Sequence, residues 1–116
     1  RCEIGVGFDV RRGVVRRFLV QLQLTPRNAE TASQQIARID HNPCSTFGHD
    51  VRAEGVHVDV VLADGCERTV RPPGGTFTHR DLGDLIDHAI EYFRSHCGYF
   101  RSVHVGDVDP DEPPRW

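Results

Sequence analysis

The sequence predicts an α+β domain: an antiparallel sheet of four to six strands with one main amphipathic helix, at about residues 79–97, packed on one face. Apolar and polar residues alternate over 14–24 and again over 55–62, which is the period of a half-buried strand. Apolar residues then recur at helical spacing from Leu82 to Cys97. Because the alternation leaves one sheet face polar, it favours an antiparallel sheet over a parallel one.

The first half of the chain supplies three of the expected strands. Residues 2–8 form a short strand-like run, and the glycine at position 13 allows a turn before the strand at 14–24, which Pro26 ends. Residues 34–40 are read either as a weaker strand or as the end of a short helix that begins near Ala29.

A hairpin is expected in the second half. The strand at 55–62 is followed by Ala63-Asp64-Gly65, an Asp-Gly hairpin signal, and residues 66–71 return as its partner. Val56, Val58, Val60 and Leu62 fall on one face of the strand, whereas His57, Asp59 and Val61 fall on the other.

The main helix has a predicted start and end. Thr78 with Asp81 resembles a capping pair, and Gly98 stands where a helix commonly ends. We expect a short edge strand over 99–105 and a single domain over 1–106. An acidic, proline-rich tail over 107–116 is expected to be loose.

Composition limits the function classes. The 116 residues contain no lysine, so mechanisms that need a catalytic lysine are excluded. Residues 1–38 hold seven arginines against three acidic residues, whereas 39–116 hold seven against fourteen. The basic N-terminal part suits either an RNA backbone or an acidic partner, and equally an ordinary solvated strand face. Apolar runs are too short to cross a bilayer, so no membrane association is expected.

The four cysteines form no Cys-x-x-Cys pair, and their spacing matches neither a zinc finger nor a redox motif. They are interpreted as reduced thiols of a cytoplasmic protein.

Candidate site residues gather in one segment, residues 40–59, where histidines and acidic residues are denser than elsewhere in the chain. Imidazole is the side chain that titrates near neutral pH without special help. On a strand, residues two apart project from the same face, which makes His57 and Asp59 a workable pair. If the strands on either side of the segment pair as a hairpin, Asp40 and His57 come close together. The alternative is turn chemistry and a hydrated sheet face without a site.

Two chemical interpretations of this segment remain open. In the first, His49 and His57 act as an acid–base pair on a phosphodiester, with Arg52 stabilising phosphate charge and Asp50 or Asp59 orienting the imidazoles. His41 is a further catalytic candidate. In the second, His49, His57 and Asp59 bind a divalent metal ion in a hydrolase. The first interpretation needs no cofactor.

The segment resembles a small prokaryotic family of unknown function, through Ile39-Asp40-His41-Asn42, Gly48-His49-Asp50-Val51, Glu54-Gly55-Val56-His57 and Val58-Asp59-Val60. The order of elements is similar to that of TumE-like toxins of toxin–antitoxin operons, which place an Asp/Asn turn and histidines between strands and close with a helix. This likeness implies an RNA-directed toxin held by an antitoxin, but it assigns no catalytic residue.

The leading functional hypothesis is therefore a small cytoplasmic protein that acts on nucleic acid, of the ribonuclease-toxin kind, with RNA and an antitoxin-like protein as expected partners. The alternatives are a protein-binding module without catalysis and the metal-dependent hydrolase. The sequence alone leaves open whether the protein is an enzyme.

Overall fold

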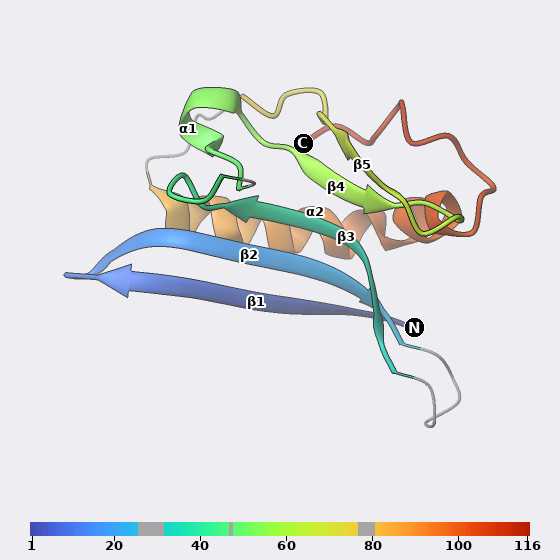
Figure 1. Cartoon of the computed structure of the whole chain (residues 1–116), viewed down its shortest axis with the longest axis horizontal. Helices are drawn as coiled ribbons and strands as arrows, with labels where there is room; N and C mark the ends of the chain where they lie inside the picture. The colour runs from blue at the N-terminus through green and yellow to red at the C-terminus, as the bar shows by residue number, and fades with distance from the viewer. Residues whose placement is uncertain (26–31, 47, 77–80) are drawn as a thin grey trace.

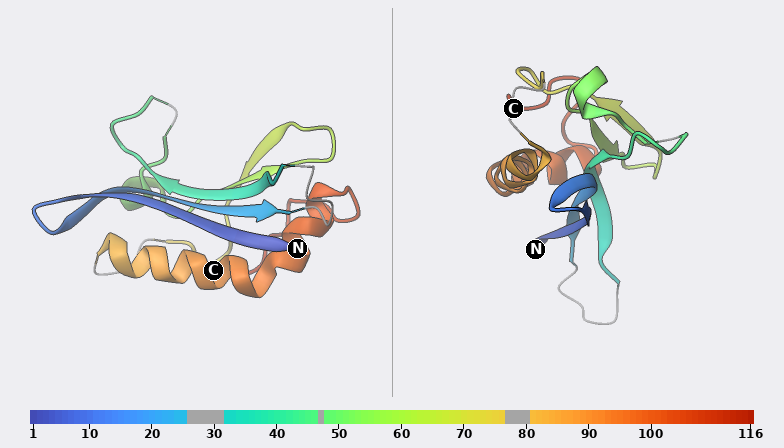
Figure 2. Two further views of the ribbon diagram at one scale, coloured as in Figure 1. Left: turned by 90° about the horizontal axis from the view of Figure 1, so that it is seen from below. Right: turned by 90° about the vertical axis from the view of Figure 1, so that its left-hand side faces the viewer.

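A computed structural model describes residues 1–25, 32–46, 48–76 and 81–116. It confirms the α+β class. Five strands form one antiparallel sheet, and a long helix covers one of its faces (Figures 1 and 2). The elements in chain order are β1 (Cys2–Arg11), β2 (Val14–Leu24), β3 (Gln34–His41), α1 (Val51–Glu54), β4 (Val58–Val61), β5 (Glu67–Val70) and α2 (Leu82–His104).

The sheet is a simple meander in which neighbours in space are neighbours in sequence, β1-β2-β3-β4-β5. The weaker strand prediction for 34–40 is therefore confirmed as β3, while Ala29 lies outside the described residues. β1 is longer than expected because it runs to Arg11, and the turn to β2 places both Arg12 and Gly13 at positive φ. Two consecutive positive φ angles are the geometry of the tightest hairpin turns.

The register of the strands shows which residues lie on each face of the sheet. Phe18 pairs with His41, and the same face carries Val20, Leu22, Ile39, Ala37 and Val60, all of them buried beneath α2. On the other face Gln21 pairs with Arg38, Arg38 with Asp59, and Asp59 with Thr69. Since directly paired residues project from one side, the sheet has an apolar inner face and a polar outer face. The outer face is where site residues are expected.

The helix α2 is longer than predicted. It begins after Asp81, whose carboxylate accepts a hydrogen bond from the Asp84 amide (2.9 Å), and it runs to His104. The proposed capping partner Thr78 and residues 79–80 lie outside the described residues. The expected helix end at Gly98 and the edge strand over 99–105 are both wrong.

The reason for this error is visible in the packing. Phe100 and Val103 are buried in the same apolar face as Phe93, so the helical spacing continues past Gly98. His96 has non-helical backbone angles (φ −120°, ψ 19°) and marks a kink between two helical segments. Gly98 therefore lies close to a bend in the helix and does not mark its end.

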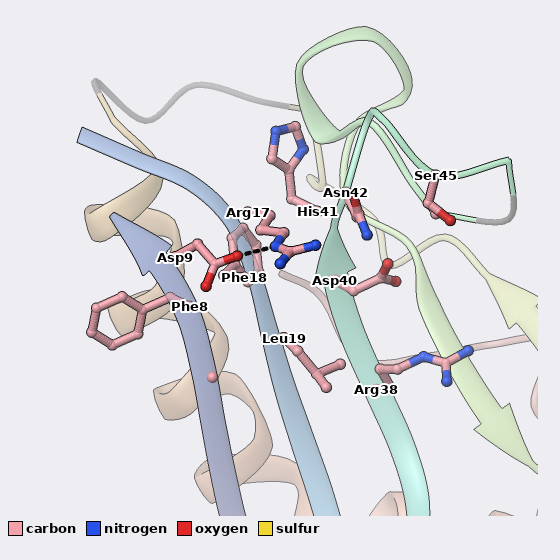
Figure 3. Close-up of a pocket in the computed structure, with 12 residues that line it drawn as sticks. Phe8, Asp9, Arg17, Phe18, Leu19, Arg38, Asp40, His41, Asn42 and Ser45 are labelled. Carbon is pink, nitrogen blue, oxygen red and sulfur yellow. Dashed lines mark hydrogen bonds and ion pairs between the residues drawn. The ribbon is translucent and has the colours of Figure 1, made fainter. Parts of the chain in front are cut away.

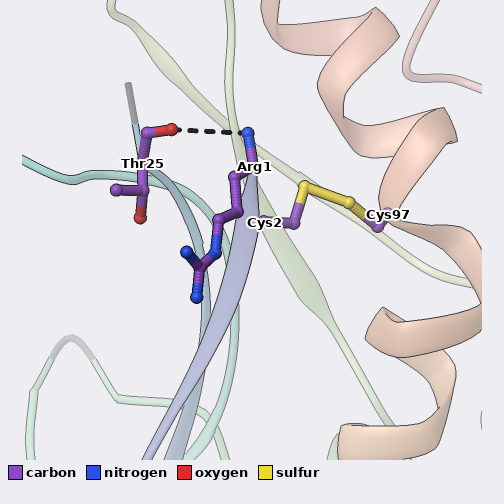
Figure 4. Close-up of a disulfide and its surroundings, with 4 residues drawn as sticks. All are labelled: Arg1, Cys2, Thr25 and Cys97. Atoms are coloured by element: carbon purple, nitrogen blue, oxygen red, sulfur yellow. Dashed lines mark hydrogen bonds between the residues drawn. A yellow bond between two sulfur atoms is a disulfide. The ribbon is translucent and has the colours of Figure 1, made fainter. Parts of the chain in front are cut away.

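A disulfide joins Cys2, at the start of β1, to Cys97, just after the kink in α2 (Figure 4). The expectation of four reduced thiols is wrong for this pair, because the meander brings the first strand against the second half of the helix. Cys44 and Cys66 are free and exposed. A cross-link between residues 95 positions apart cannot be inferred from spacing alone.

Residues 107–116 lie against the domain, and the expectation of a loose tail is wrong. The Tyr92 hydroxyl donates to the Pro114 carbonyl (2.8 Å), and the Trp116 amide donates to the Pro73 carbonyl (2.8 Å). The Trp116 indole stacks on His88, with ring centroids 4.2 Å apart. No helix among the described residues combines the length and apolar character needed to cross a membrane.

Candidate functional site

The candidate site lies on the polar outer face, where the connection from β3 to β4 folds back over the sheet. Two backbone contacts shape this connection: the Asn42 amide donates to the His49 carbonyl (2.8 Å), and the Val51 amide donates to His41 Nδ1 (3.1 Å). A Cβ atom at position 48 would collide with the Asn42 carbonyl oxygen, so Gly48 is required for the close return. The return places His49 over the sheet.

The single-turn helix α1 positions the next group. Asp50 accepts hydrogen bonds from the amides of Arg52 (3.1 Å) and Ala53 (3.4 Å), as an N-cap residue does. Gly55 ends the turn at φ 79°, a backbone conformation that favours glycine. Glu54, the last residue of α1, thereby reaches back toward the two histidines.

His49, Glu54 and His57 converge on one point. Glu54 Oε2 lies 3.6 Å from His49 Nδ1 and 3.7 Å from His57 Nδ1. The two imidazole rings are tilted against each other, with centroids 4.8 Å apart. His57 is 6% exposed, and within the described part of the chain its Nδ1 has no hydrogen-bond partner. A buried polar atom without a hydrogen-bond partner calls for an explanation, and a role as a ligand-binding atom is one.

A second carboxylate holds His49 from the opposite side. His49 Nε2 lies 3.3 Å from Asp59 Oδ1. Asp59 is itself fixed by the Thr69 hydroxyl (2.5 Å) and by Arg38 Nη2 (2.8 Å), which also reaches Glu67. In the tautomer that carries its proton on Nε2, His49 donates to this carboxylate and its Nδ1 lies unprotonated on the side of Glu54.

Burial and neighbouring groups shift the pKa values of His57 and Asp59. Burial, together with the charges of His49 and Arg71, lowers the pKa of His57 below its usual 6.5. Burial raises the pKa of Asp59, but hydrogen bonds from Thr69, Arg38 and His49 outweigh burial, and the net direction is down. At neutral pH His57 is therefore a neutral imidazole and Asp59 an ionised carboxylate.

Asp40 forms a second possible group with His49 and Asp59, whose ligand atoms all lie within 4.8 Å of one another. Burial raises the pKa of the Asp40 carboxyl, and its Oδ1 has no partner among the described residues. This group uses the Nε2 side of His49. It competes with the first group for the same imidazole. Its carboxylate Asp59 already accepts hydrogen bonds from Arg38 and Thr69, whereas Glu54 Oε2 accepts one, from the Asp50 amide (3.2 Å).

Two hollows flank the cluster. One, of about 520 Å³, runs along the outer face over β1, β2 and β3, where Arg38, Asp40 and Leu19 project between the strands and Arg17 is paired with Asp9 (Figure 3). The other, of about 300 Å³, is lined by Glu54 together with Arg52 and Arg71. Two arginines and one carboxylate of the cluster therefore line the same hollow.

The structure brings together His49, His57 and Asp59 from the predicted set, and it places the others elsewhere. His41 is on the inner face, buried at 3% exposure and stacked on Phe18. Asp50 caps α1. Arg52 lines the second hollow and also a hollow beside His41 and Asp50.

Sequence reasoning missed Glu54 as a cluster member and Arg38 and Thr69 as supports of Asp59. Glu54 stands in the predicted segment, but only the turn of α1 brings it to both histidines. Arg38 and Thr69 come from neighbouring strands, and only the strand register identifies them. The strand pairing that was expected to bring Asp40 near His57 exists, with Arg38 opposite Asp59.

Comparison with known families gives one match. The model of a domain of unknown function, DUF7718, covers residues 1–107, which is most of the chain. Comparisons with curated proteins and with solved structures give no match.

Proposed function

We propose that this chain, which belongs to the DUF7718 family, binds a divalent transition metal through His49, Glu54 and His57 and uses it to hydrolyse a phosphodiester. The observation that supports this proposal is the convergence of two imidazole nitrogens on one carboxylate oxygen, at 3.6 and 3.7 Å.

These separations fit a tetrahedral ion. Zinc bonds to histidine nitrogen and carboxylate oxygen are about 2.0–2.2 Å long. Tetrahedral bonds of that length hold neighbouring ligand atoms about 3.3–3.5 Å apart. The two nitrogen–oxygen pairs in the structure are a few tenths of an ångström wider, and the two imidazole nitrogens lie within 4.8 Å of each other, so the three groups would move inward to bind an ion. Two histidines and one glutamate leave a fourth position for water, as catalytic zinc sites do.

The surroundings supply what such a site requires. Asp59 would orient His49 as a carboxylate–histidine–metal relay does. A bound zinc ion lowers the pKa of its water to near neutrality and so supplies hydroxide. Arg71 and Arg52 line the hollow beside Glu54, where guanidinium groups suit a phosphate. Together these features favour phosphoester chemistry over a purely structural metal.

RNA cleavage by His49 and His57 without metal is the second candidate, and the resemblance to TumE-like toxins favours it. The two imidazoles do converge, as acid–base chemistry would need. Their centroid separation of 4.8 Å, with Glu54 shared between them, leaves little room for a phosphate in the middle. This geometry supports the metal proposal more strongly.

Metal titration of the purified, chelator-treated protein tests the proposal. We expect one zinc ion per chain, and Glu54→Gln should weaken zinc affinity by at least about tenfold. Glu67→Gln is the matched control, because Glu67 has a similar exposure (51% against 46%) and pairs with Arg38 instead of the histidines. Equal affinities in both variants would contradict the assignment of Glu54.

Hydrolysis of a chromogenic phosphodiester and of single-stranded RNA separates the two candidates. Metal-dependent hydrolysis should stop with chelator and return with zinc, and it should be lost in Glu54→Gln. Cleavage of RNA that persists in chelator but is lost in His57→Asn would favour the metal-free ribonuclease.

A further inference from the structure

The two edges of the sheet differ in a way that points to a partner. β5 is only four residues long, is largely exposed and charged, and lies beside the C-terminal segment through an ion pair between Arg68 and Asp111. β1 is ten residues long and pairs only with β2, so its outer edge has no strand beside it in the described structure. A long unpaired edge is a template for another strand.

β1 lacks the features that usually protect such an edge. It contains no proline and no lysine. The register shift of the β1–β2 hairpin adds its extra residue, Arg16, to β2 and leaves β1 regular. The inner-face positions of β1 are all uncharged: Cys2, Ile4, Val6, Phe8 and Val10. Charges placed inward, bulges and prolines are the common protective devices.

The inner face of β1 also exposes apolar side chains that α2 leaves uncovered. Val6, Phe8 and Val10 are 42%, 57% and 52% exposed. In Figure 3 the Phe8 ring extends beyond β1 on the side away from β2. An apolar stripe beside an open strand edge is what a strand-adding partner would cover.

We propose that β1 pairs with β1 of a second copy of this chain, antiparallel about Gly7, to form a continuous ten-stranded sheet. This register places Phe8 beside Val6 of the second copy and Val10 beside Ile4, so apolar residues meet on the inner face. On the outer face it places Glu3 opposite Arg11 of the second copy, and the two-fold symmetry makes this pair twice.

The charged residues of β1 favour this register over the two neighbouring ones. Centring the pairing on Val6 would set Glu3 opposite Asp9 and Arg1 opposite Arg11, which juxtaposes like charges at both ends. Centring it on Phe8 would leave both Glu3 and Arg11 opposite glycine. Of these three registers, the one about Gly7 is the most complementary in charge, and a second copy is the occupant we infer.

Sedimentation velocity of the full chain from about 1 to 200 µM tests the dimer, since this range populates a dimer of micromolar Kd. We expect a concentration-dependent dimer. Phe8→Lys should weaken it by about a hundredfold, because the substitution enters the interface twice. The matched control is Val105→Lys, at 55% exposure after the end of α2, where His104 contacts the Val61 carbonyl of β4, and it should leave the dimer unchanged.

A charge swap tests the register. Glu3→Arg and Arg11→Glu should each weaken the dimer, and the double variant should restore it, since both residues are exposed and neither supports the core. A chain that stays monomeric at 200 µM would overturn the proposal and leave a strand from a different protein as the occupant of the edge. A dimer unaffected by Phe8→Lys would overturn it as well.

Discussion

Asp59 Oδ1 lies 3.3 Å from His49 Nε2, so one carboxylate of β4 fixes an imidazole that arrives from a loop ten residues earlier in the chain. The sheet thereby sets the orientation of a side chain that does not belong to it. Arg38 and Thr69, on the strands to either side, complete the arrangement.

Asp59→Asn is expected to weaken zinc affinity by about 10–100-fold, because it removes the carboxylate that orients His49. Isothermal titration on the folded fraction measures this effect. The variant also leaves Arg38 without its closest partner, so its stability should be measured separately by denaturant unfolding. Thr69→Ala is the control, because it removes one hydrogen bond to Asp59 but keeps the carboxylate. A smaller loss of zinc affinity is expected there, and an equal loss would contradict the orienting role.

Loss of the Cys2–Cys97 disulfide is expected to destabilise the fold by roughly 4–5 kcal/mol, the chain-entropy value for a loop of about 100 residues. The denaturant midpoint of Cys2→Ser, compared with the oxidised wild type, measures this. Cys44→Ser should leave the midpoint unchanged, since Cys44 is free and exposed. If the midpoint of wild type is insensitive to reducing agent, the cross-link does not stabilise the protein.

Stability should fall as pH drops below about 6.5. Burial lowers the pKa of His41 in the folded chain, although Asp50, 3.9 Å away, opposes this effect. The unfolded chain then binds the proton more tightly than the folded chain, so the stability present above pH 6.5 is lost as pH decreases toward the folded pKa. His57 contributes in the same direction.

His41→Asn should flatten part of this pH dependence, because its side-chain oxygen can accept from the Val51 amide but does not titrate. Unfolding free energies at pH 5 and pH 8 in both proteins provide the comparison. An identical pH dependence in the variant would show that His41 is not one of the groups responsible.

Tyr92→Phe is expected to cost about 1 kcal/mol of stability, the usual net value of one hydrogen bond, because the Tyr92 hydroxyl donates to the Pro114 carbonyl. Burial raises the pKa of this phenol, so the bond persists at alkaline pH. Tyr99→Phe removes a more exposed bond, to the Asp109 carbonyl (3.2 Å), and should cost less. Thermal unfolding distinguishes the two, and equal costs would contradict the burial argument.

The strands of the sheet could be predicted because the alternation of apolar and polar residues is visible in each short stretch of sequence. The strand at 14–24, the hairpin around Asp64-Gly65 and the polar side of β4 all follow from neighbouring residues. The end of α2 was not predictable from Gly98, because the burial of Phe100 against the sheet outweighs one helix-weakening residue. The disulfide and the packed tail depend on contacts between distant parts of the chain. The spacing of apolar residues along the sequence gives no information about such contacts.

The candidate site was partly predictable for the same reason. Period two placed His57 and Asp59 on one face of a strand over 55–62, but β4 begins only at Val58, so Asp59 lies in the strand and His57 lies just before it. The position of Glu54 depends on a single turn of helix that Asp50 caps. His41 was wrongly predicted to lie in the site, because β3 continues through it and its ring faces the inner side of the sheet. Because side chains alternate along a strand, the residue at which β3 ends determines whether the His41 imidazole faces the cluster or the core.

The bond between Cys2 and Cys97 has a consequence for biosynthesis. A ribosome makes Cys2 before its partner Cys97, and the free cysteines Cys44 and Cys66 are made between the two. Oxidation of a nascent chain would therefore offer Cys2 only incorrect partners until α2 is nearly complete. Efficient maturation thus favours late oxidation, or an isomerase that corrects early mispairing.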